Sequence, residues 1–232
     1  MYRRWTRDLR DRRKNNMNKL ISIQEAVSKV KDGDVVMIGG FLGVGSPHKM
    51  IDALVAQGTK NLTLICNDSG FVDIGVGKLV VNKQFSKIIA SHIGTNKETG
   101  RQMMEGETEV VLTPQGTLAE QIRAACYGLG GILTATGVGT KVAEGKMMIP
   151  VNGREYLLEL PLHANVALIF ANKGDKYGNL SYHGAAQNFN SVMAGAADIT
   201  ICEVDEYSEE ALCPDRAETP GVFVNYIVKG KE

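Results

Sequence analysis

The sequence predicts an α/β fold, with an open and mostly parallel sheet that carries helices on both faces. Short apolar runs alternate with stretches of helical spacing along most of the chain, which is typical of a parallel sheet built from βαβ units. The first apolar run leads directly into a glycine-rich loop and a helix start. One Asn-Gly pair within a β-rich stretch adds an antiparallel hairpin to this pattern.

The first predicted βα unit follows a short amphipathic helix. Residues 23–30 have helical spacing, and Ser22 is placed to act as the N-cap of this helix. Val35–Ile38 is a continuous apolar run, as expected for a strand buried on both faces. After the glycine-rich loop, Ser46 is the expected N-cap and Pro47 the expected first residue of a helix over residues 47–57.

The remaining elements repeat this alternation. Residues 146–160 are predicted to form the hairpin, with Asn152-Gly153 at its turn, either added to the sheet or lying over it. Residues 128–145 are rich in glycine and threonine, and we expect a loop that is mobile unless something binds it. Further strands are expected at residues 62–65, 87–90, 109–112, 166–170 and 199–204, and further helices at residues 96–105 and 118–127.

Composition excludes several classes of protein. Basic and acidic side chains number 26 each, so the chain lacks the basic excess with which duplex nucleic-acid binders neutralise phosphates. No apolar run approaches the roughly 18–20 residues of a membrane span. A chain of 232 residues is long enough for one sizeable core. We therefore predict a single domain over residues 17–232, with no nucleic-acid or membrane partner.

Residues 1–16 differ from the rest of the chain. They contain six arginines, one lysine and two aspartates and lack the apolar core of a signal peptide, so we expect a disordered extension outside the domain. The four cysteines are scattered, with no C-x-x-C pair, and three of them lie in apolar or small-residue stretches where core packing is expected. These features predict free thiols and a cytoplasmic location.

The glycine-rich loop is the first candidate binding element. Its glycines allow close backbone approach to a ligand, and the following helix start adds positive partial charge. By itself this pattern fits a phosphate or dinucleotide loop, a carbonyl-bearing ligand or a tight structural turn. The loop consists of Gly39, Gly40, Phe41, Leu42, Gly43, Val44 and Gly45.

Read together with its flanks, this segment resembles the signature of coenzyme A transferase alpha subunits, family I. That signature is Asp-Gly, two free positions, three aliphatic residues, Gly-Gly-Phe, three free positions, Gly, one free position and Pro. The chain satisfies it with Asp32-Gly33, Val36-Met37-Ile38, Gly39-Gly40-Phe41, Gly45 and Pro47. Segments similar to the family's other motifs start at Cys66, Ala90, Pro114, Thr134, Gly178 and Ala194. The resemblance covers roughly residues 20–228 and is strongest to the acetate, butyrate–acetoacetate and 3-oxoacid types, because of the segment NDSGFVDIGVG that starts at Asn67.

The resemblance implies an open sheet of the CoA-transferase/NagB-like kind and a specific reaction. Enzymes of this family move coenzyme A from an acyl thioester to a short carboxylic acid, by a ping-pong path through a glutamyl-coenzyme A thioester. The nucleophilic glutamate belongs to a partner beta subunit, and the Glu-Asn-Gly type of turn that carries it is absent from this sequence. The family therefore implies a heteromeric enzyme, with coenzyme A thioesters as substrates and no permanently bound cofactor.

Gln115 is the predicted catalytic contribution of this chain. It follows the predicted strand Glu109–Leu112 at the start of a helix, and its amide N–H₂ can stabilise an oxyanion without titrating. By resemblance it points into the active site, and the alternative is an amide that caps the helix. The resemblance also assigns residues 39–45 to the coenzyme A or acyl pocket and Asn67 and Asp68 to its neighbouring wall, although Asp68 could equally cap a turn. No metal-ligand spacing is present, so no metal site is predicted.

Two other readings remain open from the residues alone. In a Rossmann dehydrogenase, Asp68 would hold a ribose, but Phe41 and the order of glycines depart from the usual fingerprint; a sugar-phosphate isomerase would use a related sheet. A non-catalytic sensor or scaffold could share the same fold. Preference among short acyl groups depends on pocket volume, where one methylene is worth about 1–3 kcal/mol.

Overall fold

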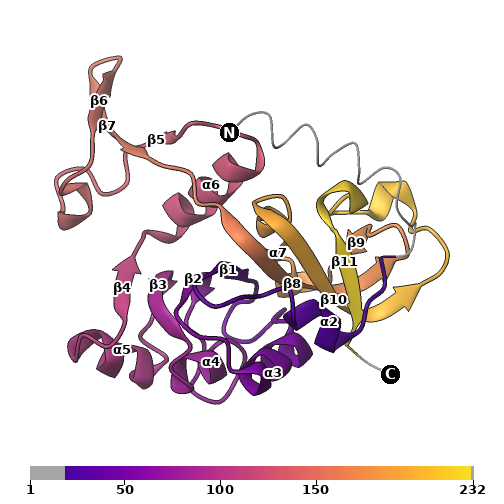
Figure 1. The fold of residues 1–232 in the computed structure, drawn as a ribbon. Coiled ribbons are helices and arrows are strands. Elements are labelled where there is room, and N and C mark those ends of the chain that lie inside the picture. Colours follow the sequence, from indigo (N-terminus) through magenta and orange to yellow (C-terminus); the bar gives the residue numbers. More distant parts are fainter. Residues whose placement is uncertain (1–18, 231–232) are drawn as a thin grey trace.

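The computed structural model describes residues 19–230, and its body is one mostly parallel sheet (Figure 1). The strand order is β11-β10-β8-β1-β2-β3-β4, with the short β9 antiparallel to β8. All other neighbours in this sheet are parallel, which confirms the predicted fold class. The predicted disordered extension, residues 1–16, lies outside the described residues. The strands are β1 (Val35–Ile38), β2 (Leu62–Asp68), β3 (Phe85–His92), β4 (Glu109–Leu112), β8 (Ala164–Asp175), β9 (Leu180–Ser181), β10 (Ala197–Ser208) and β11 (Tyr226–Lys229).

Helices cover both faces of the sheet because successive strand residues point to opposite sides. Val36 and Ile38 of β1 join a core that includes residues of the first three helices, whereas Met37 packs in a second core with Leu118 and Ile122. No helix within residues 19–230 is long and apolar enough to cross a membrane. The helices are α2 (Ile23–Val27), α3 (His48–Gln57), α4 (Gly77–Val81), α5 (Lys97–Met104), α6 (Gln115–Cys126) and α7 (Asn190–Met193), with short 3-10 turns at Lys141–Ala143, Gly184–Ala186, Pro214–Arg216 and Gly221–Phe223.

Element identity was predicted better than element length. Ser22 caps α2 as expected, accepting the Glu25 N–H at 3.1 Å, but the helix ends at Val27 rather than at residue 30. The strands β2, β3, β8 and β10 all run beyond their apolar centres, and β2 thereby includes Asn67 and Asp68. The sequence did not reveal α4, α7, β9 or β11, because elements of two to five residues are too short to show a period.

The start of α3 differs from the prediction. The helix begins at His48, Pro47 precedes it, and no side chain from the local sequence caps it. Instead the buried carboxylate of Glu203, on β10, accepts the N–H groups of Lys49 at 3.2 Å and Met50 at 2.9 Å. A carboxylate at this position satisfies two free helical N–H groups and complements the helix dipole. Burial raises the pKa of Glu203 above its usual range in spite of these donors.

The predicted hairpin is confirmed, and it belongs to a second, three-stranded sheet that projects from the body (Figure 1). Its order is β5-β7-β6, and all pairs are antiparallel. Asn152 and Gly153 both have positive φ, 49° and 76°, as a type I′ turn requires. Residues 128–145, expected as a loop, contain the strand β5 and a 3-10 turn. We call residues 131–160 the arm; its strands are β5 (Ile132–Thr134), β6 (Met148–Val151) and β7 (Arg154–Glu159).

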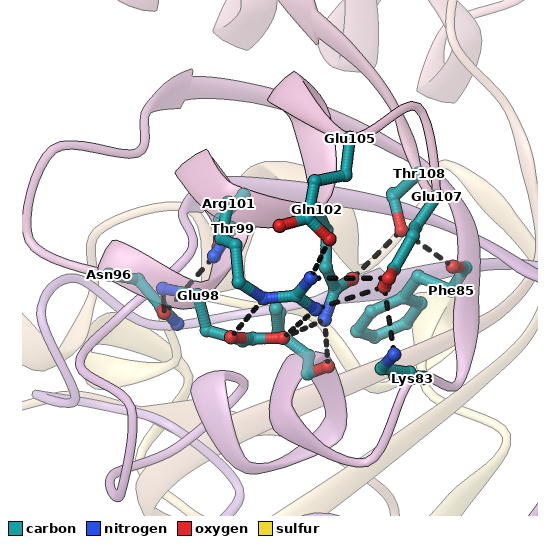
Figure 2. Close-up of polar contacts among 11 residues, drawn as sticks. Lys83, Phe85, Asn96, Glu98, Thr99, Arg101, Gln102, Glu105, Glu107 and Thr108 are labelled. Atoms are coloured by element: carbon teal, nitrogen blue, oxygen red, sulfur yellow. Dashed lines mark hydrogen bonds and ion pairs between the residues drawn. The ribbon is translucent and has the colours of Figure 1, made fainter.

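A partly exposed ion-pair network fixes α5 to its neighbours. Asn96 caps this helix through the N–H groups of Glu98 and Thr99. The Arg101 guanidinium then bonds Glu98 at 2.7 Å and Glu107 at 2.9 Å, and it also contacts Glu105 (Figure 2). These contacts lower the pKa of Glu98 to about 2 and that of Glu107 to about 2.

We expect Glu98→Gln to lower the thermal unfolding midpoint at pH 7. Because folding lowers the pKa of Glu98 from 4.5 to about 2, its stabilising effect is present above pH 4.5 and is lost as the pH falls toward 2. The difference from wild type should therefore shrink over this interval in melts recorded at a series of pH values. Glu155→Gln is the control, since Glu155 is exposed and forms no ion pair with a described residue. An equal deficit for Glu98→Gln at pH 7 and pH 2.5 would contradict this account.

Candidate active site

The loop after β1 is held in a conformation that requires glycine. Gly40, Gly43 and Gly45 have φ values of 125°, 89° and 67°, which L side chains adopt only with strain. Phe41 and Val44 exchange two backbone hydrogen bonds, each 2.9 Å long, so the turn between them is tight. The loop is therefore a preformed element at the carboxyl end of β1.

Asp68, at the end of β2, anchors this loop from below. Its carboxylate accepts the backbone N–H groups of Leu42, at 3.1 Å, and of Gly70, at 2.9 Å. Burial raises the pKa of the Asp68 carboxyl, although the two N–H donors oppose this shift. These bonds are of the turn-capping kind that the sequence left open as an alternative for Asp68.

Two asparagines reach the loop from the opposite side. The Oδ1 atom of Asn188 accepts the Gly40 N–H at 3.2 Å, and its amide donates to the Val44 carbonyl at 3.1 Å. Asn190, fully buried, donates to the Gly45 carbonyl at 2.8 Å and accepts the Phe170 N–H at 2.9 Å. Both asparagines follow β8, which lies next to β1 in the sheet. The sequence analysis did not identify them, since more than 140 residues separate Gly40 from Asn188.

Gln115 and Asn67 form a pair of side-chain amides. Gln115 is the first residue of α6, and its Nε2 atom donates to the Oδ1 atom of Asn67 at 2.8 Å. The Ser91 hydroxyl donates to the same oxygen at 3.0 Å and thereby fixes the orientation of the Asn67 carboxamide. With its oxygen occupied in this way, Asn67 turns its Nδ2 group elsewhere, and no described residue accepts a hydrogen bond from it. The second N–H of Gln115 is also free to donate.

These elements surround an open cavity of about 370 Å³, within the usual range for small-molecule sites. The cavity lies at the carboxyl ends of the strands, between the loops that follow β1 and β8, where the strand order changes direction; ligands of open α/β sheets bind at this position. None of the lining side chains titrates, so amide N–H groups are its polar donors. The lining residues are Phe41, Asn67, Gln115, Gly116, Ala119, Ala185, Asn188 and Phe189.

The structure thus brings together three of the predicted site residues, Phe41, Asn67 and Gln115, around one cavity. Asp68 lies behind the loop and, with Gly39, Gly40 and Gly43, borders a separate small void. Leu42, Val44 and Gly45 complete the loop without lining the larger cavity. A free amide pair beside an apolar wall can bind a carbonyl or a carboxylate oxygen and stabilise an oxyanion.

Asp68 offers a test of loop anchoring. Asp68→Ala should lower the free energy of unfolding by about 2 kcal/mol, because it leaves the two backbone N–H groups without an acceptor. Asp68→Asn keeps an acceptor and removes a buried charge, so its free energy of unfolding at pH 7 should stay within about 0.5 kcal/mol of wild type. Urea unfolding at pH 7 would measure both values. An asparagine variant as unstable as the alanine variant would show that the charge itself is needed.

Sequence comparison places this chain among well-described relatives. The pattern of the family described as coenzyme A transferase matches residues 20–230. The chain is 52% identical over 215 residues to the acetate CoA-transferase subunit alpha of Escherichia coli K12, covering 92% of this chain and 98% of the relative. It is 51% identical over 213 residues to the acetoacetyl-CoA:acetate/butyrate CoA transferase alpha subunit of Clostridium acetobutylicum, covering 91% and 98%.

Solved structures share the fold at lower identity. An acyl-CoA transferase apoenzyme from Escherichia coli O157:H7 superposes with a TM-score of 0.81 at 21% identity over 93% of this chain, which spans 47% of that longer chain. Glutaconate coenzyme A-transferase from Acidaminococcus fermentans gives a TM-score of 0.79 at 20% identity, covering 91% of this chain and 75% of that one. At this level of identity the likeness concerns the fold alone.

Proposed function

This chain belongs to the coenzyme A transferase family, and we propose that it is the α subunit of a short-chain acyl-CoA:carboxylate CoA-transferase. Coenzyme A thioesters and short carboxylic acids of the acetate, butyrate and acetoacetate type are the proposed substrates. The relatives described as acting on these acids are about half identical to it along nearly their whole length. The four cysteines are free thiols, in keeping with the cytoplasmic location that we propose.

The observation that carries the proposal is the amide pair of Gln115 and Asn67 at the open cavity. Transfer of coenzyme A requires attack on a thioester carbonyl, and each attack places negative charge on the carbonyl oxygen. We assign Gln115 as a donor to this oxyanion, through the N–H that Asn67 leaves free. Asn67 has two proposed roles, since its oxygen orients Gln115 and its own N–H₂ is available as a second donor. One such donor is commonly worth about 3 kcal/mol of barrier.

The arrangement also supports a nucleophile from a second subunit. None of the residues that line the cavity carries a carboxylate. Glu105 and Glu144 each precede a glycine, as a nucleophile in a tight turn would, but they lie at the end of α5 and beside a 3-10 turn in the arm. We therefore propose that a β subunit supplies the glutamate, which forms the glutamyl-coenzyme A thioester while this chain binds substrate and stabilises charge.

The dehydrogenase alternative loses its main support. It requires the carboxylate of Asp68 to accept ribose hydroxyl groups, whereas that carboxylate is engaged by Leu42 and Gly70 and does not line the cavity. A non-catalytic scaffold would need neither a cavity of substrate size nor donors that are free at its wall.

Acyl exchange tests the proposal directly. Acetyl-coenzyme A and butyrate or acetoacetate are incubated with this chain alone, with the β subunit alone and with the coexpressed pair, and the new thioester is measured by chromatography. We expect exchange only in the mixture. Exchange by this chain alone would place the nucleophile here, and exchange by the β subunit alone at the same rate would favour a scaffold.

A further inference from the structure

The arm has one apolar face that the rest of the chain leaves open. In an antiparallel ladder, directly opposed residues share a face and every second residue returns to it. The pairs Leu133↔Leu158 and Ile149↔Tyr156 therefore lie on the same face, and Met147 joins them through the hydrogen bond from the Leu158 N–H to its carbonyl. We call this set the open face; it consists of Leu133, Met147, Ile149, Val151, Tyr156 and Leu158.

The opposite face of the arm is covered by the arm itself. Leu157, at its centre, is fully buried. Residues 135–145 fold over it, and an added Cβ at Gly137 would lie 2.7 Å from Val142 and 3.4 Å from Leu157. On the open face, by contrast, Leu133, Met147 and Val151 are 43%, 63% and 38% exposed. The two faces thus differ sharply in cover although both are apolar.

A small sheet with an uncovered apolar face is poorly stabilised in water by itself. The root of the arm is secured to the body, because Glu159 is buried and bonds Lys146 at 2.6 Å and Gln121 of α6 at 3.2 Å. The arm is therefore held at a set place while its open face has no cover. This combination is expected of a surface that another chain covers.

The position of the arm identifies which chain this is. Helix α6 begins at the cavity with Gln115 and ends at Cys126, and the arm follows directly. Twelve helical residues span about 18 Å, whereas a standard interface of about 800 Å² per partner is roughly 30 Å across. Exposed residues of α6, among them Glu120 and Arg123, and then Tyr127 connect the two places along the surface.

We propose that the open face of the arm is a docking surface for the β subunit. This inference rests on the proposed function, because the subunit that brings a glutamate to the cavity must cover the surface around it. A body of ordinary interface size that fills the mouth of the cavity reaches the base of the arm. Apolar contacts dominate the docking surface, since Arg154 is the one charged residue on this face of the paired strands and stacks on the Tyr156 ring, 5.5 Å away. Association through the arm should therefore depend little on salt.

Two adjacent methionines provide a matched test. Met147 belongs to the open face, and Met148, opposite Leu157, to the other face; both side chains are exposed, at 63% and 45%. We expect Met147→Glu to weaken association with the β subunit about 100-fold or more, because docking would bury an unpaired carboxylate. Met148→Glu should bind within about threefold of wild type. Calorimetric titration of each purified variant with the cognate β subunit measures both, and Leu133→Glu repeats the test on β5.

Thermal melts of each variant separate docking from folding, since equal midpoints for Met147→Glu and Met148→Glu assign the difference in affinity to the interface. Wild-type affinity of Met147→Glu and Leu133→Glu would overturn the proposal. A change in self-association of this chain, with unchanged affinity for the β subunit, would also overturn it and assign the open face to a second copy. If the wild-type complex forms through the open face but catalyses no acyl exchange, the docking surface stands and the proposed function fails.

Discussion

Replacing Gln115 with alanine in the assembled enzyme is expected to lower turnover about 100-fold. Its free N–H would stabilise negative charge that exists only during attack on the carbonyl, so kcat and kcat/KM should fall by similar factors. Steady-state acyl exchange, measured at several concentrations of both substrates, gives the two parameters. Gln24→Ala is the matched control, because this glutamine is exposed on α2, away from the cavity.

The partnership with Asn67 sharpens this test. If Asn67 acts partly by orienting Gln115, the double alanine variant should lose less activity than the product of the two single losses. Independent, multiplicative losses would instead show that each amide acts separately. Turnover of Gln115→Ala within threefold of wild type would remove Gln115 from the reaction and leave it as the first residue of α6.

Asn190→Ala is expected to have the largest effect on stability. The change removes three hydrogen bonds, from the Phe170 N–H at 2.9 Å and to the carbonyls of Gly45 and Ala186 at 2.8 Å each, at a fully buried position. Buried backbone groups left without partners cost about 1–3 kcal/mol each, so the free energy of unfolding should fall by about 3 kcal/mol or more. Urea unfolding measures it, and Asn82→Ala, which removes one bond at the surface, should cost about 0.5 kcal/mol.

A double-mutant cycle with Gly39 tests the same packing. An added Cβ at Gly39 would lie 1.8 Å from the Oδ1 atom of Asn190, so Gly39→Ala alone must displace that side chain or the loop. In the Asn190→Ala background this obstacle is absent. We therefore expect the double variant to be more stable than the sum of the single effects predicts. Strict additivity would mean that the loop moves away from β8 without resistance.

Several features of this protein follow from local sequence. Val35–Ile38 and Glu109–Leu112 were predicted with their observed bounds, because a strand between turn residues is visible as an apolar run. The Asn152-Gly153 turn depends on two residues that accept positive φ. The motif around the glycine loop gave the family, because each glycine answers a local backbone requirement. Gln115 was likewise predicted from a local cue, its place just after a strand and at a helix start.

Only the tertiary structure decided which groups meet around the loop and what remains uncovered. Glu203 caps α3 in place of Ser46, and Asn190 contacts Gly45 across 145 positions of the chain. These contacts exist because β8 pairs with β1 and β10 pairs with β8, and no local pattern specifies the order of parallel strands. The same is true of the arm, whose hairpin was visible in the sequence while its separation from the main sheet was not. Propensity and turn chemistry act over a few residues, whereas strand order is chosen by the burial of whole faces, and it is strand order that assembled the cavity and left the open face exposed.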